Sequence, residues 1–329
     1  MAHLIPVRYK GRGELNYPPD VKPLVGEISL NFSVGKSGIA KSITELREKG
    51  VEFFSLHTQE PHSRDEKIRK QILNNLHSIV TENNLVNIKR SPTYLWSSKE
   101  WIEEFITFLK IASESFDDRN SVRVIELHTP KNKSYINSID TFMDKLKSFY
   151  DAVSSIFPKA EFVIENSYEE PYLYNIEQIN EFSNRIDELK GSNYKFGIVL
   201  DIPQLLQAEG LRDINADGDK IENLFRSLEK SKHNIRSIHV WGTRGEGENG
   251  NPHHGDLNTL FHHGYPRSNK EIEKAESLKQ SLLKGLSFIL SDENKRYLVP
   301  ELNGDPYNDL ESILRDLSTA GINFDYSLP

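Results

Sequence analysis

Four short apolar segments in the second half of the chain each end on a side chain that can bind a metal ion. These side chains are Glu165, Asp201, His239 and Glu301. A carboxylate at the end of a buried segment is costly unless a partner compensates its charge. Three carboxylates in one pocket would repel one another and raise their pKa values, unless a divalent cation lay among them. We therefore predict that the four residues bind one metal ion.

The identity of that ion is narrowed by the ligand types. The chain has no cysteine, so thiolate sites and disulfides are both excluded. Three carboxylates and one imidazole make an oxygen-rich site that suits Mn²⁺, Mg²⁺, Co²⁺ or Zn²⁺. The competing interpretation is that each acid merely caps the following helix or pairs with a lysine or arginine. Capping or ion pairing readily explains a single acid at the end of a strand, but it explains less well why four such residues occur in successive strands.

The elements that must position these residues alternate along the chain. Eight short apolar or β-branched segments predict strands at 24–32, 51–58, 85–91, 122–129, 160–167, 195–201, 235–242 and 296–303. Helical periodicity lies at 38–50, 64–83, 98–116, 136–157, 175–191, 219–231, 269–291 and 305–321. Eight strands alternating with eight helices predict a single-domain α/β protein, a (β/α)₈ TIM barrel. In such a barrel the active site forms where strands end and helices begin.

The domain boundaries follow from this pattern. Residues 1–23 are expected to form an irregular N-terminal lead-in, and residues 24–329 the barrel, with the active site at the C-terminal ends of its strands. The Gly- and His-rich stretch 242–267 is too long for an ordinary connection, and such loops are usually functional. A dinucleotide-binding sheet has no support, because no G-x-G-x-x-G follows the first strand.

Composition limits the partners. Hydrophobic residues make up 36% of the chain and charged residues 27%, the balance of a soluble globular protein. No apolar run is long enough to span a bilayer, and the N-terminus lacks the features of a signal peptide. We therefore expect a cytoplasmic protein without a membrane partner. A net charge of −8 makes nucleic acid a less favoured partner than a small molecule. A homo-oligomer is compatible with the sequence.

The strand ends resemble those of the xylose-isomerase-like TIM barrel superfamily. The matching motifs are "VIEN" at Glu165, "GIVLDIPQLLQAEG" at Asp201, "SIHVWG" at His239 and "LVPELNG" at Glu301. This superfamily contains sugar isomerases and epimerases and the apurinic endonuclease family 2 enzymes. The resemblance covers the chain from about residue 122 onward. It implies the barrel fold and the four-residue metal site, whereas one barrel can host many reactions.

The sequence differs from the endonuclease branch at residues that would bind the additional metals of that branch. The resemblance implies additional metal positions at His128 and His253. However, the segment assigned as strand three, 85–91, ends without the expected histidine. Gln204 stands where a histidine is expected after Asp201, and Asn251 stands where an aspartate is expected before His253. These differences favour one metal, although epimerases also tend to keep a histidine at the Gln204 position.

Two functional hypotheses follow. The first is a metal-dependent isomerase or epimerase of a carbohydrate or related hydroxy-carbonyl compound, with Glu165 and Glu301 as the acid/base pair. Arg244 would then bind a substrate oxygen or phosphate, and Trp241, together with Trp96, would form an apolar wall against the sugar. The alternative is a metal-dependent phosphodiesterase or endonuclease, in which His128 and His253 bind further cations.

Overall fold

The structure is a computed structural model. It describes residues 2–8, 17–30, 35–58, 95–96, 99–130, 136–168, 172–246, 252–261, 268–302 and 308–325.

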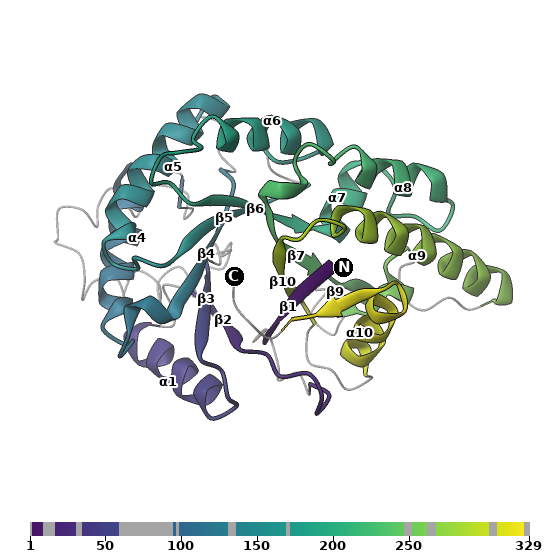
Figure 1. The fold of residues 1–329 in the computed structure, drawn as a ribbon, viewed down its shortest axis with the longest axis horizontal. Coiled ribbons are helices and arrows are strands. Elements are labelled where there is room, and N and C mark those ends of the chain that lie inside the picture. The colour runs from purple at the N-terminus through teal and green to yellow at the C-terminus, as the bar shows by residue number, and fades with distance from the viewer. Residues whose placement is uncertain are drawn as a thin grey trace.

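Eight parallel strands close into a barrel. In chain order they are β1 (Ala2–Arg8), β2 (Val25–Ser29), β3 (Phe53–His57), β4 (Val122–His128), β5 (Glu161–Glu165), β6 (Phe196–Asp201), β7 (Ile235–Val240) and β10 (Lys295–Pro300). Each strand pairs with the next, and β10 pairs back to β1. Figure 1 shows helices around this ring. The (β/α)₈ barrel predicted from the sequence is therefore confirmed.

The first barrel strand lies in the segment expected to be an irregular lead-in. β1 pairs with both β10 and β2, and Leu4, Ile5 and Val7 are buried. Pro6 within the run obscured the strand pattern, because proline is unusual in a paired strand. The predicted strand 85–91 lies outside the described residues. Among the described strands, β3 pairs directly with β4, and the ring is closed by the eight strands named above.

The helices of the described chain pack outside the barrel. They are α1 (Gly35–Arg47), α4 (Lys99–Ser113), α5 (Ile139–Ser154), α6 (Ile176–Asp187), α7 (Ile202–Ala208), α8 (Gly218–Arg226), α9 (Asn269–Ile289) and α10 (Asp309–Thr319). Seven of them overlap the predicted helical segments, and five of these lie entirely within them. The short α7 was not predicted, and the segment 64–83 lies outside the described residues.

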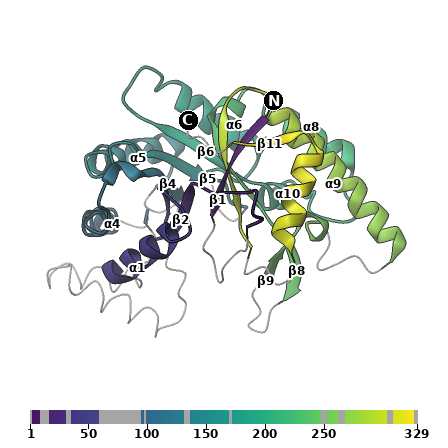
Figure 2. The same ribbon diagram turned by 60° about the horizontal axis from the view of Figure 1, so that its bottom comes forward.

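The long stretch after β7 has its own structure. A two-stranded antiparallel hairpin, β8 (Gly242–Glu246) and β9 (Pro252–Gly255), is followed by a 3₁₀ turn at Leu257–Thr259. Figure 2 shows the hairpin projecting from one end of the barrel. A short ninth parallel strand, β11 (Ile322–Phe324), pairs with the start of β1. None of the described helices is long and apolar enough to cross a membrane.

A buried arginine stabilises the start of β10. The Arg296 side chain is fully buried and donates to both carboxylate oxygens of Asp292, over 2.7 and 2.8 Å. It also donates to the Lys232 carbonyl oxygen, before β7. Burial alone would raise the pKa of Asp292, but Arg296 lowers it below its ordinary value. The pair therefore contributes stability above the ordinary carboxyl pKa, and this contribution is lost as the pH falls through the lowered pKa.

We expect Asp292→Asn to destabilise the barrel by about 3 kcal/mol, the low end for breaking a buried ion pair, because Asp292 is partly exposed. Urea unfolding at neutral pH measures this loss. Below about pH 4 the difference from the wild type should shrink progressively, since Asp292 becomes protonated first in the unfolded state and, below its lowered pKa, in the folded state as well. Glu222→Gln, in the exposed Glu222–Arg226 pair of α8, is the matched control and should change stability little. An equal effect of both variants would contradict the role given to Arg296.

Candidate metal site

The four residues predicted from the sequence meet at the C-terminal ends of four neighbouring strands. Glu165 ends β5, Asp201 ends β6, His239 lies in β7, and Glu301 follows β10 directly. Asp201 and His239 are paired in register across β6 and β7. All four side chains are buried, with Glu301 the most accessible at 9%. The barrel thus brings together residues 136 positions apart in the sequence, from Glu165 to Glu301.

Their ligand atoms have the spacing of a metal shell. His239 Nδ1 lies 3.2 Å from Glu301 Oε1 and 3.7 Å from Glu165 Oε1. Ligand atoms about 2.0–2.1 Å from a tetrahedral cation are roughly 3.3 Å apart. Asp201, His239 and Glu301 can supply atoms that all lie within 4.8 Å of one another. This group is called the first donor group below.

Asp201 also caps a helix, which is the structural role considered above as the alternative to metal binding. Its Oδ1 accepts the Gln204 N–H over 2.8 Å and so caps α7, while its Oδ2 accepts the Trp241 indole N–H over 3.0 Å. The Asn166 side chain holds the Asp201 backbone through two further hydrogen bonds. An ionised carboxylate has about four acceptor positions. Capping therefore leaves acceptor positions for a cation and fixes the orientation of the carboxylate.

A second donor group lies beside the first and consists of His57, His128 and Glu165. His57 ends β3, His128 ends β4, and their Nε2 atoms are 3.2 Å apart. His128 Nδ1 is 3.0 Å from Glu165 Oε2. Glu165 and His128 were predicted from the sequence as a metal ligand and an additional metal ligand, but His57 was not, because 85–91 was assigned as strand three. Once β1 is counted as the first strand, the third strand is β3, and it ends on the histidine that was expected there.

Glu165, a member of the second donor group, also faces the first. Its Oε1 is the atom near His239 and also accepts the Gln204 side-chain amide over 3.2 Å. Its Oε2 faces His128, and His57 Nε2 is 3.9 Å from it. One carboxylate therefore presents one oxygen to each donor group, with Gln204 orienting the oxygen that faces the first.

Two buried carboxylates lie deeper in the barrel and were not predicted as site residues. Glu27 on β2 and Glu126 on β4 are each 1% exposed. Glu27 Oε1 is 3.3 Å from His57 Nδ1, and Glu126 Oε2 is 3.2 Å from His239 Nε2. The signal available in the sequence was a lone acid inside an apolar strand, "VGEIS" for Glu27 and "VIELH" for Glu126.

The electrostatics of the cluster fit bound cations. Burial, with the nearby Glu126 and Glu301 carboxylates, raises the pKa of Glu165 well above its ordinary value despite the opposing effect of His239. Burial also raises the pKa of Asp201 to about 6, and Glu301 adds to this. Among the described residues, Glu165 Oε2 and both ring nitrogens of His239 lack a hydrogen-bond partner of acceptable geometry. Buried polar atoms are normally paired, and cations at the two donor groups would satisfy Glu165 Oε2 and His239 Nδ1.

Trp241 and its neighbours lie beside the first donor group, because the Trp241 indole donates to Asp201. The His254 ring stacks on Trp241 with ring centroids 4.1 Å apart, and the Arg212 guanidinium lies 4.3 Å from the indole centroid. His254 Nδ1 also contacts the Glu301 carbonyl oxygen. Arg212 was not predicted from the sequence. The side chains of His253 and Arg244 lie outside the described residues, so their predicted roles stay predictions.

Trp96 is not an apolar wall of the site. It is 1% exposed, packs edge-to-face against Phe142 and Phe149, and donates its indole N–H to the His128 carbonyl oxygen over 2.7 Å. The expectation that Trp96 faces a sugar was wrong, because its ring fills the layer between the barrel and the helices. Its hydrogen bond nevertheless holds the backbone of His128.

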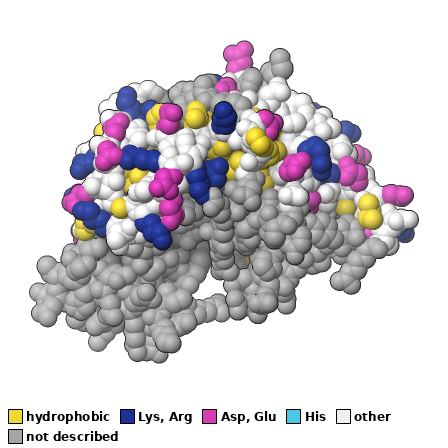
Figure 3. All heavy atoms as spheres, turned by 90° about the horizontal axis from the view of Figure 1, so that it is seen from below, with side chains coloured by type: hydrophobic (Ala, Val, Ile, Leu, Met, Phe, Trp, Pro, Cys, Tyr) yellow, Lys and Arg dark blue, Asp and Glu magenta, His cyan; other side chains and the backbone are white. Residues whose placement is uncertain are grey.

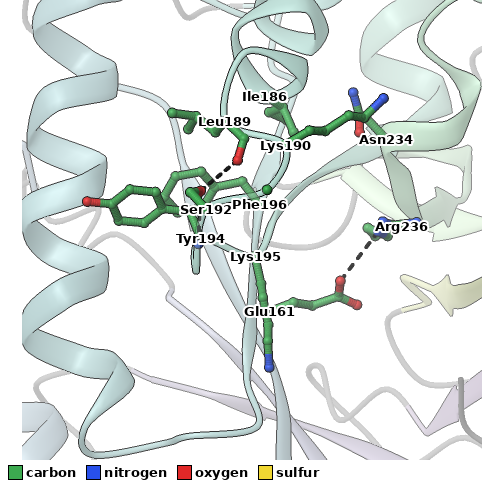
Figure 4. Close-up of a pocket in the computed structure, with 11 residues that line it drawn as sticks. Glu161, Ile186, Leu189, Lys190, Ser192, Tyr194, Lys195, Phe196, Asn234 and Arg236 are labelled. Carbon is green, nitrogen blue, oxygen red and sulfur yellow. Dashed lines mark hydrogen bonds and ion pairs between the residues drawn. The ribbon is translucent and has the colours of Figure 1, made fainter.

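A separate cavity of about 420 Å³ lies at the opposite end of the barrel (Figure 4). Its walls include Glu161 and Phe196, which begin β5 and β6. Two cationic groups there have acidic partners: Arg236 lies 3.4 Å from Glu161, and Lys190 lies 3.0 Å from Asp187. This cavity is therefore not the candidate site.

The surface charge of the described residues is mixed. Figure 3 shows one face of the molecule, on which lysine and arginine side chains alternate with aspartate and glutamate. A strongly basic area, as nucleic-acid binding usually requires, is not seen among the described residues of that face.

Comparison with known proteins supports the fold. No family model and no curated protein matches the chain. Among solved structures, a protein described as a glycoside hydrolase has a TM-score of 0.51 at 11% identity, covering 97% of this chain and 99% of its own. A xylose isomerase domain protein from Planctomyces limnophilus has a TM-score of 0.48 at 12% identity, with coverages of 97% and 95%. A D-tagatose 3-epimerase-like protein gives 0.45 at 14%, with coverages of 91% and 90%. The barrel fold predicted from the sequence is thus confirmed by the strand topology, and the glycoside hydrolase structure shares this fold.

Proposed function

We propose that this chain is a divalent-metal-dependent enzyme in which two cations share Glu165, and that it hydrolyses a phosphate ester. The observation that carries the proposal is the position of Glu165, with one oxygen toward His239 and the other toward His128. Pairs of cations about 3.5–4 Å apart are typical of phosphatases and nucleases, where they bind both the attacking and the leaving oxygen.

The donor set fits this chemistry. His57 and His128 with Glu165 would hold one cation, and Asp201, His239 and Glu301 with Glu165 the other. Mn²⁺, Zn²⁺ and Co²⁺ suit mixed imidazole and carboxylate ligands. When bound, such cations polarise a phosphoryl oxygen and acidify a water molecule.

The remaining residues orient these ligands and shape the entrance. Gln204 holds one oxygen of Glu165, while the α7 N-terminus and Trp241 hold Asp201. Arg212, beside Trp241 and hydrogen-bonded to Thr243, is placed to attract an anionic substrate group toward the entrance. Stacked Trp241 and His254 cover one side of the site and reduce the access of water.

A second candidate is the isomerase or epimerase of a carbohydrate predicted from the sequence. The observation that favours it is that the four residues of a one-cation site are complete without His57 and His128. In this reaction Glu165 and Glu301, both next to His239, would remove and return a proton at a carbon beside a carbonyl group. Gln204 then orients the base.

Metal content is the first test. Purified protein reloaded with Mn²⁺ or Zn²⁺ should contain two ions per chain by elemental analysis. His57→Asn should reduce the content to one, because it removes a ligand of the second donor group alone. A wild-type content of one ion, unchanged in His57→Asn, would instead support the isomerase.

The reaction itself separates the two candidates. We expect hydrolysis of an activated phosphodiester or phosphomonoester by the loaded enzyme, and at least a hundredfold loss in kcat for His57→Asn. Isomerisation would instead appear as incorporation of deuterium from D₂O into a ketose, and His57→Asn would leave it intact. NMR of candidate ketoses in D₂O detects this exchange.

Glu165→Gln should reduce kcat for hydrolysis by two to three orders of magnitude, roughly the loss seen when one transition-state-stabilising group is removed. Glu161→Gln, at the other end of the same strand, is the matched control and should keep full activity, because Glu161 contacts Arg236 and not the donor groups. A Glu165→Gln enzyme with wild-type turnover would exclude any catalytic role for this carboxylate.

Removal of the metal should destabilise the fold. Three carboxylates and three histidines, all buried except His128, lie together in the two donor groups. A ligand present at a hundred times its Kd stabilises the folded state by about 2.7 kcal/mol. A chelator should therefore lower the Tm by several degrees, and adding Mn²⁺ should restore it. An unchanged Tm in both conditions would speak against tight metal binding.

A further inference from the structure

We infer that Glu27 and Glu126 are positioning residues, each of which holds one metal-binding histidine by its far ring nitrogen. This inference rests on the proposed function, because it concerns the ligands of the two cations. It adds a role for two buried carboxylates that lie outside the two donor groups. Glu126 can also form a third group with Glu165 and His239, whose ligand atoms lie within 4.8 Å of one another, and the test below separates a ligand role of Glu126 from a positioning role.

The geometry at His57 is the clearer case. Its Nε2 faces the second donor group, 3.2 Å from His128 Nε2. Its Nδ1 points the other way and lies 3.3 Å from Glu27 Oε1. Glu27 belongs to neither donor group. A neutral imidazole that binds a cation through one nitrogen carries its proton on the other. Glu27 would accept that proton in a hydrogen bond and so fix which nitrogen is free to bind.

His239 repeats the arrangement from another strand. Its Nδ1 faces Glu301 of the first donor group and Glu165 of the second, and its Nε2 lies 3.2 Å from Glu126 Oε2. Glu126 precedes His128 by two residues on β4 and therefore points to the same face of the strand, one layer deeper. On β4, His128 thus belongs to the second donor group, while Glu126 contacts His239 of the first.

The energetic argument is that an isolated buried carboxylate is costly. Both acids are 1% exposed, and Glu27 Oε2 and Glu126 Oε1 have no hydrogen-bond partner of acceptable geometry among the described residues. The hydrogen bond to a histidine beside a dication offsets part of this cost, because the positive charge stabilises the ionised acid. Such carboxylate–histidine–metal arrangements also orient the ring and raise the basicity of the bound nitrogen.

The test is the affinity for metal of Glu27→Gln and Glu126→Gln. Co²⁺ is titrated into metal-free protein and followed both by calorimetry and by its visible absorption, and Zn²⁺ affinity is measured against a chromophoric chelator. We expect each variant to bind two ions per chain with a 10- to 100-fold weaker affinity at one position, the loss typical of removing such a partner. Glu161→Gln is again the matched control and should bind like the wild type.

Further measurements distinguish a loss of metal binding from a failure to fold, and a positioning role from a ligand role. Glu27→Leu, which lacks any acceptor, should weaken binding more than Glu27→Gln, which keeps an amide oxygen. If the leucine variant does not fold, the nearly isosteric glutamine variant still gives the answer, with circular dichroism and the Tm as checks. Wild-type affinity and Co²⁺ spectrum in Glu27→Gln would overturn the inference. A Glu126→Gln protein that binds one ion would make Glu126 a ligand and overturn its positioning role. A wild type that binds no cation would refute the proposed function itself.

Discussion

The burial of many like charges in one place is the constraint on which this structure depends. Glu165, Asp201 and Glu301 end strands whose other residues are almost all apolar, and the barrel closes around them. Histidines placed between the acids relieve part of the repulsion: His239 counters burial and lowers the pKa of Glu301 to about 2. Glu165 keeps a raised pKa, since it faces carboxylates from several directions. It is therefore the residue that gains most from cations on its two sides.

The parallel barrel makes this concentration of charge possible. In a parallel sheet every strand ends at the same rim, so one residue from each of six strands can converge without any long side chain reaching across. Alternation along a strand then adds a second layer, as with Glu126 below His128 on β4. The supporting contacts are local: Asn166 and α7 hold the backbone and carboxylate of Asp201, and Trp96 holds the end of β4. Catalytic precision requires such support from rigid elements.

The sequence predicted the barrel and the first donor group because both depend on local patterns. A run such as "FGIVLD" indicates both the strand and the acid at its end, and the rim of a barrel brings such ends together. Prediction of the second donor group required the strands to be counted correctly along the chain. Pro6 disguised β1, a segment at 85–91 took its place in the count, and His57 was thereby assigned to strand two. Gln204 and Trp241 were noted from the sequence, but their contacts with Glu165 and Asp201 depend on the path of α7 and of the chain after β7. Glu27 and Arg212 could not be assigned from one sequence, since an isolated acid or arginine has many structural uses.

The site is held from two sides, by the buried carboxylates of Glu27 and Glu126 and by residues of the strand ends and the hairpin. Glu27 and Glu126 belong to β2 and β4, in the most constrained part of the fold, so the histidine rings that they contact are fixed from below. Asp201, Trp241 and His254 belong to strand ends and to the hairpin after β7, where the stacking of His254 on Trp241 joins the hairpin to the first donor group. A movement of the hairpin is therefore transmitted to Asp201 through Trp241, whereas the rings of His57 and His239 are contacted from the other side by Glu27 and Glu126. The loops beyond the strand ends are the part of a barrel that varies most between reactions.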